Sequence, residues 1–302
     1  MQIELSVIIP VYNAQQTLNR CINSIVQAQQ YAGLPMEILL INDGSTDNSP
    51  FICNSFEAKN PIIHVINTEN HGVSHARNFG IKHSNGNWIT FVDADDYIDI
   101  HSFSIISEYI YDKNTDLLGW QYDKFNQIVK TKHKPHAVWA YAFRSEVIHR
   151  HNIRFAENLK FTEDQLFISQ FRLCCSKEIA TNKILYHYCE NPKQATSQPI
   201  TLSRAESCLI AACFLAKFYE TLPCDDSKKI FVAKTCNKWF KDYIKYASMT
   251  NGISYNRIRT IANSHYAKLN HIAPYTAHHI KLMNYPCYFR VYFWLFHFKN
   301  KP

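Results

Sequence analysis

The carboxylates of Asp93, Asp95 and Asp96 are the residues of this sequence best suited to chemistry. They follow directly on residues 88–92, a β-branched and aromatic run typical of a strand buried on both faces of a parallel sheet. Open α/β sheets bind ligands at the carboxyl ends of their strands. Three closely spaced carboxylates need a cation or hydrogen-bond donors, and oxygen ligands favour Mg²⁺ or Mn²⁺ over zinc. The alternative is a solvated acidic turn before a helix that starts near His101.

Tyr12 and Asp43 each follow another predicted strand. The ring of Tyr12 offers a face on which a nucleotide base can stack, a contact worth about 1–3 kcal/mol. The carboxylate of Asp43 only accepts hydrogen bonds, so it would pair with the N3–H of uracil or thymine and repel cytosine. Alone, Tyr12 is better explained as a core aromatic, and Asp43 and Asp47 as turn and N-cap residues. Their common position at strand ends favours a nucleotide site.

Apolar runs alternate with amphipathic segments through the first hundred residues. Strands are predicted at residues 5–9, 36–41, 62–66 and 88–92, the first and the last of them buried, with helices between them. Such alternation calls for right-handed crossovers and parallel pairing. The sequence therefore predicts an α/β fold: a Rossmann-like, nucleotide-binding, mostly parallel sheet with helices on both faces.

The common phosphate-binding loops are missing from this sequence. Pro10 stands where a dinucleotide-binding fold has its first glycine, and no G-x-x-x-x-G-K-[ST] motif occurs. This disfavours a dehydrogenase and a P-loop ATPase. If phosphates bind, a metal at the Asp93 cluster must carry much of their charge.

The middle of the chain predicts further elements and a second pair of acids. We expect a helix over residues 102–111, a strand over 116–120, a polar loop or hairpin over 122–136, a strand over 137–143 and a short helix over 144–149. Thr162 is a good N-cap for a helix whose first turn holds Glu163 and Asp164. Acids there also favour the helix dipole, so the pattern alone leaves their function open.

Composition favours an ordered, reduced, intracellular protein of 302 residues. The ten cysteines contain no C-x-x-C pair and no regular framework, so we expect buried thiols rather than a zinc site or disulfides. The chain starts without a basic segment followed by an apolar one, so no signal peptide is expected.

The C-terminal hundred residues differ from the rest in charge and pattern. Residues 203–302 hold 15 Lys and Arg against 5 Asp and Glu, which suits an anionic partner. Helices are predicted over residues 202–222, 228–249 and 253–269. We therefore expect a catalytic domain over residues 1–200 and a helical, basic region over 201–302.

An aromatic tail interrupted by cations closes the chain over residues 285–301. The tail is too short and too charged to span a bilayer, whereas aromatics mixed with Lys and Arg suit a lipid headgroup region. A terminal helix packed on the same protein, or on a second subunit, explains the pattern equally well.

Four sequence motifs together resemble the family 2 glycosyltransferases of GT-A fold. They are VIIPVYN at residues 7–13, NDGSTD at 42–47, ARNFG at 76–80 followed by FVDADD at 91–96, and EDQLF at 163–167. The resemblance covers about the first 200 residues. One departure is Asn42, which stands where many members have a second aspartate.

This resemblance implies an inverting transferase that uses a UDP-sugar with Mg²⁺ or Mn²⁺. By motif position it places the nucleotide-sugar site at Pro10, Tyr12, Asn13, Asp43, Arg77, Asp93 and Ala94. It makes Asp95 the metal ligand together with Asp93, and Asp164 the general base supported by Glu163. His187 lies on a predicted strand and is a further candidate for the metal, although a strand histidine among tyrosines is more often structural.

The same resemblance implies a hydroxyl acceptor on a glycan or a lipid-linked saccharide, in bacterial surface polysaccharide or lipopolysaccharide synthesis. It places the protein in the cytoplasm, or as a peripheral protein on the inner face of the plasma membrane, and leaves a homo-oligomer open. Nucleic acid is not an expected partner, because the basic residues are spread along helices with apolar faces. The alternatives are a nucleotidyltransferase and a non-catalytic sugar-nucleotide-binding relative.

Overall fold

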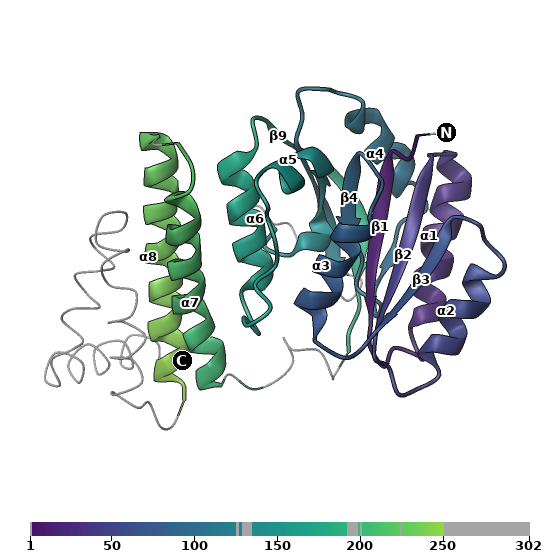
Figure 1. The fold of residues 1–302 in the computed structure, drawn as a ribbon, viewed down its shortest axis with the longest axis horizontal. Coiled ribbons are helices and arrows are strands. Elements are labelled where there is room, and N and C mark those ends of the chain that lie inside the picture. Colours follow the sequence, from purple (N-terminus) through teal and green to yellow (C-terminus); the bar gives the residue numbers. More distant parts are fainter. Residues whose placement is uncertain are drawn as a thin grey trace, which may run out of the picture. The chain divides into compact units, whose positions relative to one another are not determined.

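The computed structural model describes residues 2–124, 127–128, 135–191, 199, 201–223 and 225–250 of the chain. Within this part, nine strands form one sheet in the order β3-β2-β1-β4-β8-β6-β9-β5, with β7 paired to β6 (Figure 1). The predicted α/β class is confirmed.

The first half of the sheet is parallel and follows the predicted strands. It contains β1 (Leu5–Val11), β2 (Met36–Asp43), β3 (Ile63–Thr68) and β4 (Trp88–Phe91), with β1 between β2 and β4. In this register Ile8 lies beside Phe91 and Val11 beside Asn42. The carboxyl ends of β1, β2 and β4 therefore meet at one edge of the sheet.

Three helices connect these strands and cover both faces of the sheet. Helices α1 (Leu18–Ala32) and α2 (Ser49–Glu57) lie on one face and α3 (Val73–His83) on the other (Figure 1). The change of face follows from right-handed crossovers, because α3 leads the chain back across the sheet from β3 to β4. Helix α3 packs closely on β1: a Cβ placed on Gly80 would lie 2.4 Å from Cγ2 of Ile8.

The second half of the sheet is mixed. It contains β5 (Tyr97–Ile98), β6 (Leu117–Lys124), β7 (Gln127–Ile128), β8 (Tyr141–Arg144) and β9 (Glu178–Tyr188). Strand β8 runs antiparallel to both β4 and β6, whereas β6 and β9 are parallel. Helices α4 (Ser102–Ile110) and α5 (Ser145–Arg150) belong to this half.

The strand predicted over residues 137–143 is wrong in its first part. The structure has a 3₁₀ turn, η1 (Val138–Ala140), and the strand begins only at Tyr141. The apolar run there reflects burial rather than strand pairing, because Trp139 is buried and its ring stacks on that of Tyr186 with centroids 4.3 Å apart. The polar segment that follows residue 122 was predicted as a loop or hairpin, and β6 and β7 form an antiparallel pair there.

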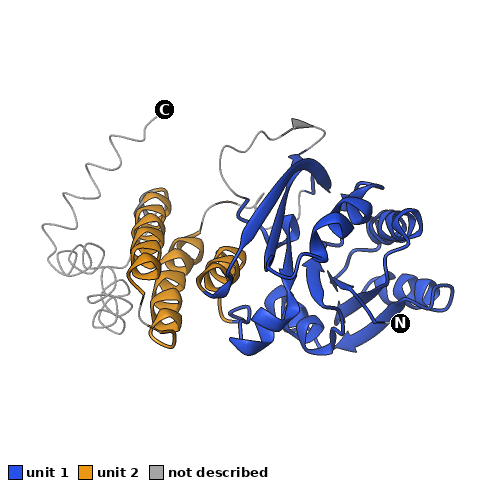
Figure 2. Ribbon diagram, turned by 90° about the horizontal axis from the view of Figure 1, so that it is seen from above, with its two compact units in different colours: residues 1–157, 174–194 blue, residues 158–173, 195–302 orange. Residues whose placement is uncertain are grey.

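The chain divides into two compact units (Figure 2). The first comprises residues 1–157 and 174–194, and the second comprises 158–173 and 195–302. The second contains most of α6 (Glu163–Cys174), with α7 (Leu202–Tyr219) and α8 (Asp226–Ser248). Helix α6, which carries the candidate base, thus clusters with the C-terminal helices, and the predicted domains 1–200 and 201–302 stay a prediction.

The helices predicted over residues 202–222 and 228–249 are present as α7 and α8. Their core includes the buried rings of Trp239 and Phe240, and Nε1 of Trp239 donates to Oε1 of Gln165 at 3.0 Å. No helix among the described residues combines the length and apolar character needed to cross a membrane. The helix predicted over 253–269 and the aromatic tail over 285–301 lie outside the described residues.

Candidate active site

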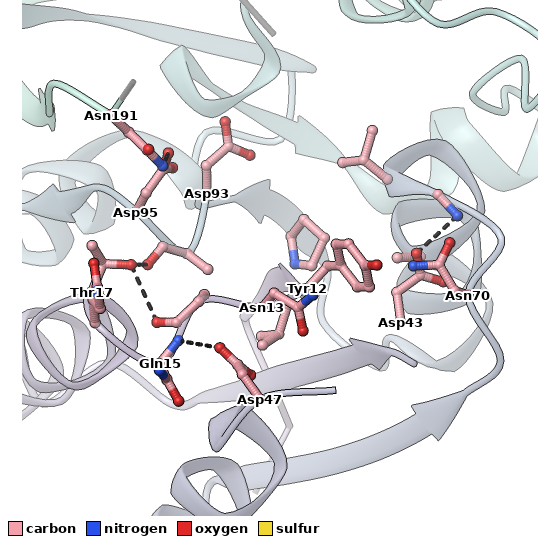
Figure 3. Close-up of a pocket in the computed structure, with 18 of the residues that line it drawn as sticks. Tyr12, Asn13, Gln15, Thr17, Asp43, Asp47, Asn70, Asp93, Asp95 and Asn191 are labelled. Carbon is pink, nitrogen blue, oxygen red and sulfur yellow. Dashed lines mark hydrogen bonds between the residues drawn. The ribbon is translucent and has the colours of Figure 1, made fainter. Parts of the chain in front are cut away.

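A cavity of about 860 Å³ opens in the first unit at the carboxyl ends of β1, β2 and β4. In Figure 3 the labelled side chains run from Asp43 and Asn70, past Tyr12, to Asp93 and Asp95. Six of the seven predicted nucleotide-sugar residues line this cavity, namely Pro10, Tyr12, Asn13, Asp43, Asp93 and Ala94, and so does the predicted metal ligand Asp95. Strand ends that are far apart in sequence therefore converge on one pocket.

The loop after β1 presents Tyr12 to the cavity. The Tyr12 side chain is 53% exposed, which leaves its ring free to take a stacking partner. The next residue, Asn13, has a left-handed backbone with φ of 49° and accepts the backbone N–H of Thr46 through Oδ1 at 2.8 Å. Its own N–H donates to Oγ of Ser45 at 3.1 Å. These two hydrogen bonds join the loops that follow β1 and β2, directly next to Tyr12 in the chain.

Asp43 is buried and organises the loop that follows β3. Its Oδ1 accepts the backbone N–H of His71 at 2.9 Å, and its Oδ2 accepts that of Gly72 at 2.8 Å. Each carboxylate oxygen has a second lone pair, so these bonds leave acceptor capacity for a ligand. Asn70 lines the cavity beside Asp43 and was not singled out from the sequence. The proposed contact of Asp43 with a base stays a prediction.

Gly44 allows this close approach of the two loops. Its φ is +65°, a left-handed conformation that only glycine adopts without strain. A Cβ at this position would lie 2.7 Å from the backbone nitrogen of Asn70. The motif glycine is therefore required both by its backbone and by the space that Asn70 occupies.

Arg77 reaches the site through Asp93. The guanidinium is buried and its NH2 donates to Oδ1 of Asp93 at 2.9 Å, while its Cζ lies 5.3 Å from the ring centroid of Phe155. Arg77 does not line the cavity, unlike the other residues of the predicted nucleotide-sugar set. Its observed contact is with the carboxylate that faces the cavity, and a direct bond to the nucleotide stays a prediction.

Both the backbone and the side chain of Asp95 accept hydrogen bonds. Its backbone carbonyl accepts from NH2 of Arg20 at 2.7 Å, and its Oδ2 accepts from Nδ2 of Asn191 at 2.9 Å. Asn191 follows β9 and lines the cavity with its neighbour Glu190. Asn191 was expected only as the start of a polar loop over the donor, and Glu190 was not expected at all, because a polar residue after a distant strand carries no motif.

Asp96, the third acid of the cluster, is fully buried and does not line the cavity. Its Oδ2 accepts from the hydroxyl of Tyr186 at 2.6 Å and its Oδ1 from the backbone N–H of Cys189 at 2.7 Å. Burial, with the charge of Asp93, raises the pKa of Asp96 to about 8, and the hydrogen bonds only partly offset this. Asp93 and Asp95 thus face the cavity, whereas Asp96 is buried and holds the turn in place through its hydrogen bonds to Tyr186 and Cys189.

The carboxylates of Asp93 and Asp95 fit a hard divalent cation, because both offer oxygen and both border one cavity. Among the described residues, no group of three or more His, Cys, Asp or Glu side chains is arranged to hold a metal. Of the described residues, Asp93 and Asp95 would supply the carboxylates, and phosphate oxygens and water could complete the ligands of Mg²⁺ or Mn²⁺.

His187 lies apart from the cavity lining. Its Nδ1 is 2.8 Å from Oδ2 of Asp123, and its ring stacks on that of Tyr97 with centroids 4.4 Å apart. These contacts match the structural role that a strand histidine usually has, and its role as a metal ligand stays a prediction.

Glu163 and Asp164 lie in the first turn of α6, as predicted, and this helix start belongs to the second unit. The helix begins behind Thr162, whose φ of 71° is rare for a β-branched residue. The carbonyl of Thr162 accepts the N–H of Leu166 at 2.9 Å, which starts the helical ladder. The catalytic roles of Glu163 and Asp164 stay predictions.

Comparison with known proteins gives relatives that are named as glycosyltransferases. The uncharacterized glycosyltransferase EpsJ of Bacillus subtilis is 32% identical over 225 residues, which cover 65% of this chain and 63% of that protein. TarS of Staphylococcus aureus, a poly(ribitol-phosphate) beta-N-acetylglucosaminyltransferase, is 25% identical over 202 residues, which cover 61% of this chain and 35% of TarS. The chain thus spans less than two thirds of the length of these relatives.

Solved structures share the fold. TarS residues 1–349 in complex with UDP-GlcNAc match with a TM-score of 0.76 at 18% identity, covering 93% of this chain and 88% of that one. A mannosyltransferase of Pyrobaculum calidifontis in complex with GDP-Man and Mn²⁺ matches with a TM-score of 0.56 at 13% identity, covering 100% and 89%. The TarS likeness confirms the expected GT-A fold. The family model described as glycosyl transferase family 2 matches residues 6–176, more than half of the chain, and the protein belongs to that family.

Proposed function

We propose that this protein transfers a sugar from a UDP-sugar to a hydroxyl of a glycan or lipid-linked saccharide, with inversion at the anomeric carbon. The observation that carries the proposal is the single cavity on which Tyr12, Asp43, Asp93 and Asp95 converge. A pocket with an exposed aromatic ring at one end and two carboxylates at the other, able to hold a divalent cation, suits a nucleoside diphosphate bound together with that cation.

The uracil would bind at the end of the cavity formed by Tyr12, Asp43 and Asn70. The exposed Tyr12 ring supplies a stacking surface, and the Asp43 carboxylate, held by two backbone N–H groups, accepts from the uracil N3–H. Asn70 adds an amide that can both donate and accept. Asp93 would accept from the ribose hydroxyls.

Asp93 and Asp95 would hold Mg²⁺ or Mn²⁺ beside the diphosphate. When bound, the ion supplies Lewis-acid stabilisation of the charge that develops on the leaving UDP. Both carboxylates are oriented by hydrogen bonds within the protein: Arg77 orients Asp93, and Asn191 orients Asp95. Asp93 can serve both roles because each of its oxygens can accept more than one partner.

Asp164 would act as the general base of a single displacement. It would take the proton of the acceptor hydroxyl while that oxygen attacks the anomeric carbon from the side opposite the departing diphosphate. The C–O bond to the acceptor forms as the bond to the diphosphate breaks, so an α-linked donor gives a β-linked product. Glu163 would support Asp164 from the same helical turn.

We place the acceptor in bacterial surface polysaccharide synthesis, and the protein in the cytoplasm or at the inner face of the plasma membrane. The relatives named as glycosyltransferases support the acceptor class. The aromatic and basic residues 285–301 would bind the membrane surface. Liposome flotation of the chain shortened after Asn284 tests that part: binding that persists unchanged would exclude the tail as the anchor.

The transferase proposal is tested by calorimetric titration of the full chain with UDP, with and without Mn²⁺, followed by UDP-release assays over a panel of UDP-sugars. We expect UDP to bind more tightly with Mn²⁺, and Asp95→Asn to remove that gain while UDP alone still binds. Absence of UDP binding under both conditions would overturn the proposal. Release of pyrophosphate instead of UDP would favour the nucleotidyltransferase alternative.

A further inference from the structure

A second hollow of about 520 Å³ lies between α3 and residues 154–157, also within the first unit. It shares no lining residue with the donor cavity, although both border the same helix: Val73 and Ala76 face the first, and His75 and Phe79 the second. We call it the α3 groove, and its other lining residues are Asn78, Lys82, Arg154, Phe155 and Glu157. Of these residues only Phe155, whose ring packs against Arg77, adjoins the donor site.

The lining of the α3 groove holds two cations and one acid, so its formal charge is positive. Lys82 is exposed and Arg154 is half-buried, and neither takes part in an ion pair among the described residues. Arg154 donates through NH1 to the carbonyl of Ile153 at 2.7 Å, which orients its guanidinium and leaves its other N–H groups for a ligand. The one acid of the lining, Glu157, already accepts from Nδ2 of Asn78 at 2.9 Å.

Aromatic rings run along the same side of α3 at four-residue intervals. The centroids of His71 and His75 lie 4.8 Å apart, those of His75 and Phe79 6.0 Å, and those of Phe79 and His83 4.3 Å. Nδ1 of His75 is buried and has no hydrogen-bond partner among the described residues. The groove therefore combines a strip of rings, a polar nitrogen without a partner and two cations.

The length of this strip selects an extended ligand. From His75 to Lys82 the helix rises about 10 Å, at about 1.5 Å per residue, so one phosphate cannot contact both ends. Rings and cations that line one groove suit a chain that carries both apolar sugar or polyol faces and phosphates. Arg and Lys side chains bind such phosphates by charge-assisted hydrogen bonds.

We propose that the α3 groove binds the acceptor, and that this acceptor is a chain of saccharide or polyol units joined by phosphodiesters. The inference rests on the proposed transferase function and adds the chemistry of its second substrate. Lys82 and Arg154 contact the phosphates, and Phe79 contacts the carbon face of a unit between them. These residues are binding residues and take no part in the transfer step.

The test titrates the full chain with a synthetic oligo(glycerol phosphate) in a calorimeter, at low and at high salt. The variant Lys82→Gln/Arg154→Gln should weaken binding at least about tenfold, since it removes two charge-assisted contacts. The matched control Lys59→Gln/Lys183→Gln removes the same charge from exposed sites of the first unit outside the groove, and should bind as the unaltered chain does. Lys82→Glu, a single change at an exposed position, should weaken binding as well and guards against misfolding of the double variant.

Three results would overturn the inference. These are equal binding by the groove variants and the unaltered chain, equal loss in the control, and groove-dependent binding of phosphatidylglycerol vesicles without binding of the oligomer, which would mark a membrane contact instead. UDP titration of the same samples separates the two proposals. If UDP binds normally but binding of the oligomer does not depend on the groove, only the proposed acceptor site is wrong. If UDP does not bind, the proposed transferase function is wrong as well.

Discussion

The hydroxyl of Tyr186 lies 2.6 Å from Oδ2 of Asp96, and this buried pair supports the turn that carries the cavity carboxylates. The same hydroxyl accepts the backbone N–H of Asp93 at 3.1 Å, so one oxygen joins β9 to both ends of the turn. Burial, and then the charge of Asp96, raise the pKa of Tyr186, which keeps its proton available for donation. Asp93 is thus positioned from within the core and not only by Arg77.

Replacing Tyr186 by Phe should loosen this turn. Loss of the hydroxyl leaves a buried carboxyl oxygen and a backbone N–H without their partner, which costs about 1–3 kcal/mol of unfolding free energy. We expect weaker Mn²⁺-dependent UDP binding in calorimetry and a lower midpoint in urea unfolding. Tyr111→Phe, at a side chain that is 59% exposed, is the control and should change neither. Unaltered Mn²⁺ dependence in the Tyr186 variant would show that the brace has no part in the site.

Gly44 and Gly33 form a matched pair of left-handed glycines. Both have a φ near +65°, but a Cβ on Gly44 would lie 2.7 Å from the nitrogen of Asn70, whereas a Cβ on Gly33 meets nothing within 4 Å. Each change to Ala should destabilise the fold by about 1–2 kcal/mol, the cost of a left-handed residue. Only Gly44→Ala should also weaken UDP binding, because it displaces Asn70. UDP titration and thermal unfolding of both variants measure this, and equal UDP affinity in the two would contradict the role given to Asn70.

Asp164→Asn should separate binding from transfer. The amide keeps the size of the side chain and cannot take a proton, so we expect normal folding, normal UDP binding and a loss of about 10²–10⁴ in transfer rate. UDP-release kinetics with a saturating acceptor measure the effect. Glu163→Gln is the companion variant and should lose less, because its carboxylate only supports the base. Near-full turnover by Asp164→Asn would refute the assignment.

Asp47 predicts a pH dependence of stability. Burial tends to raise the pKa of its carboxyl, but the hydrogen bonds from Ser49, and then that from the backbone of Gln15, prevail and lower it in the folded protein. A folded-state pKa below the unfolded value gives stability that is present above the unfolded pKa of about 3.9 and is lost as the pH falls through the lower, folded value.

Asp47→Asn should therefore reduce stability at neutral pH and make it less dependent on pH below about 4. Thermal unfolding between pH 3 and pH 7 measures this, with the pH profile of the unaltered chain for comparison. A variant that retains the full acid dependence of the unaltered chain would show that the carboxylate does not contribute in this way.

Much of the fold and most of the donor pocket could be predicted from the sequence. The apolar runs at residues 5–9, 36–41 and 88–92 are long and uniform, as buried strands require, and they are present as β1, β2 and β4. The run at 62–66 is present as the edge strand β3, in which only Ile63 is buried. Parallel strands joined by helices must end at one edge of the sheet. The residues that follow them, among them Tyr12, Asp43 and Asp93, therefore had to meet there.

The tertiary structure alone decided how these side chains are held. The bonds between Asp95 and Asn191, and between Asp96 and Tyr186, join residues that are 96 and 90 positions apart. Local patterns reflect burial and helical or strand period, whereas such contacts depend on strand register and on the direction in which each side chain leaves the backbone. For that reason three neighbouring aspartates that look alike in the sequence become two that face the cavity and one that braces the core.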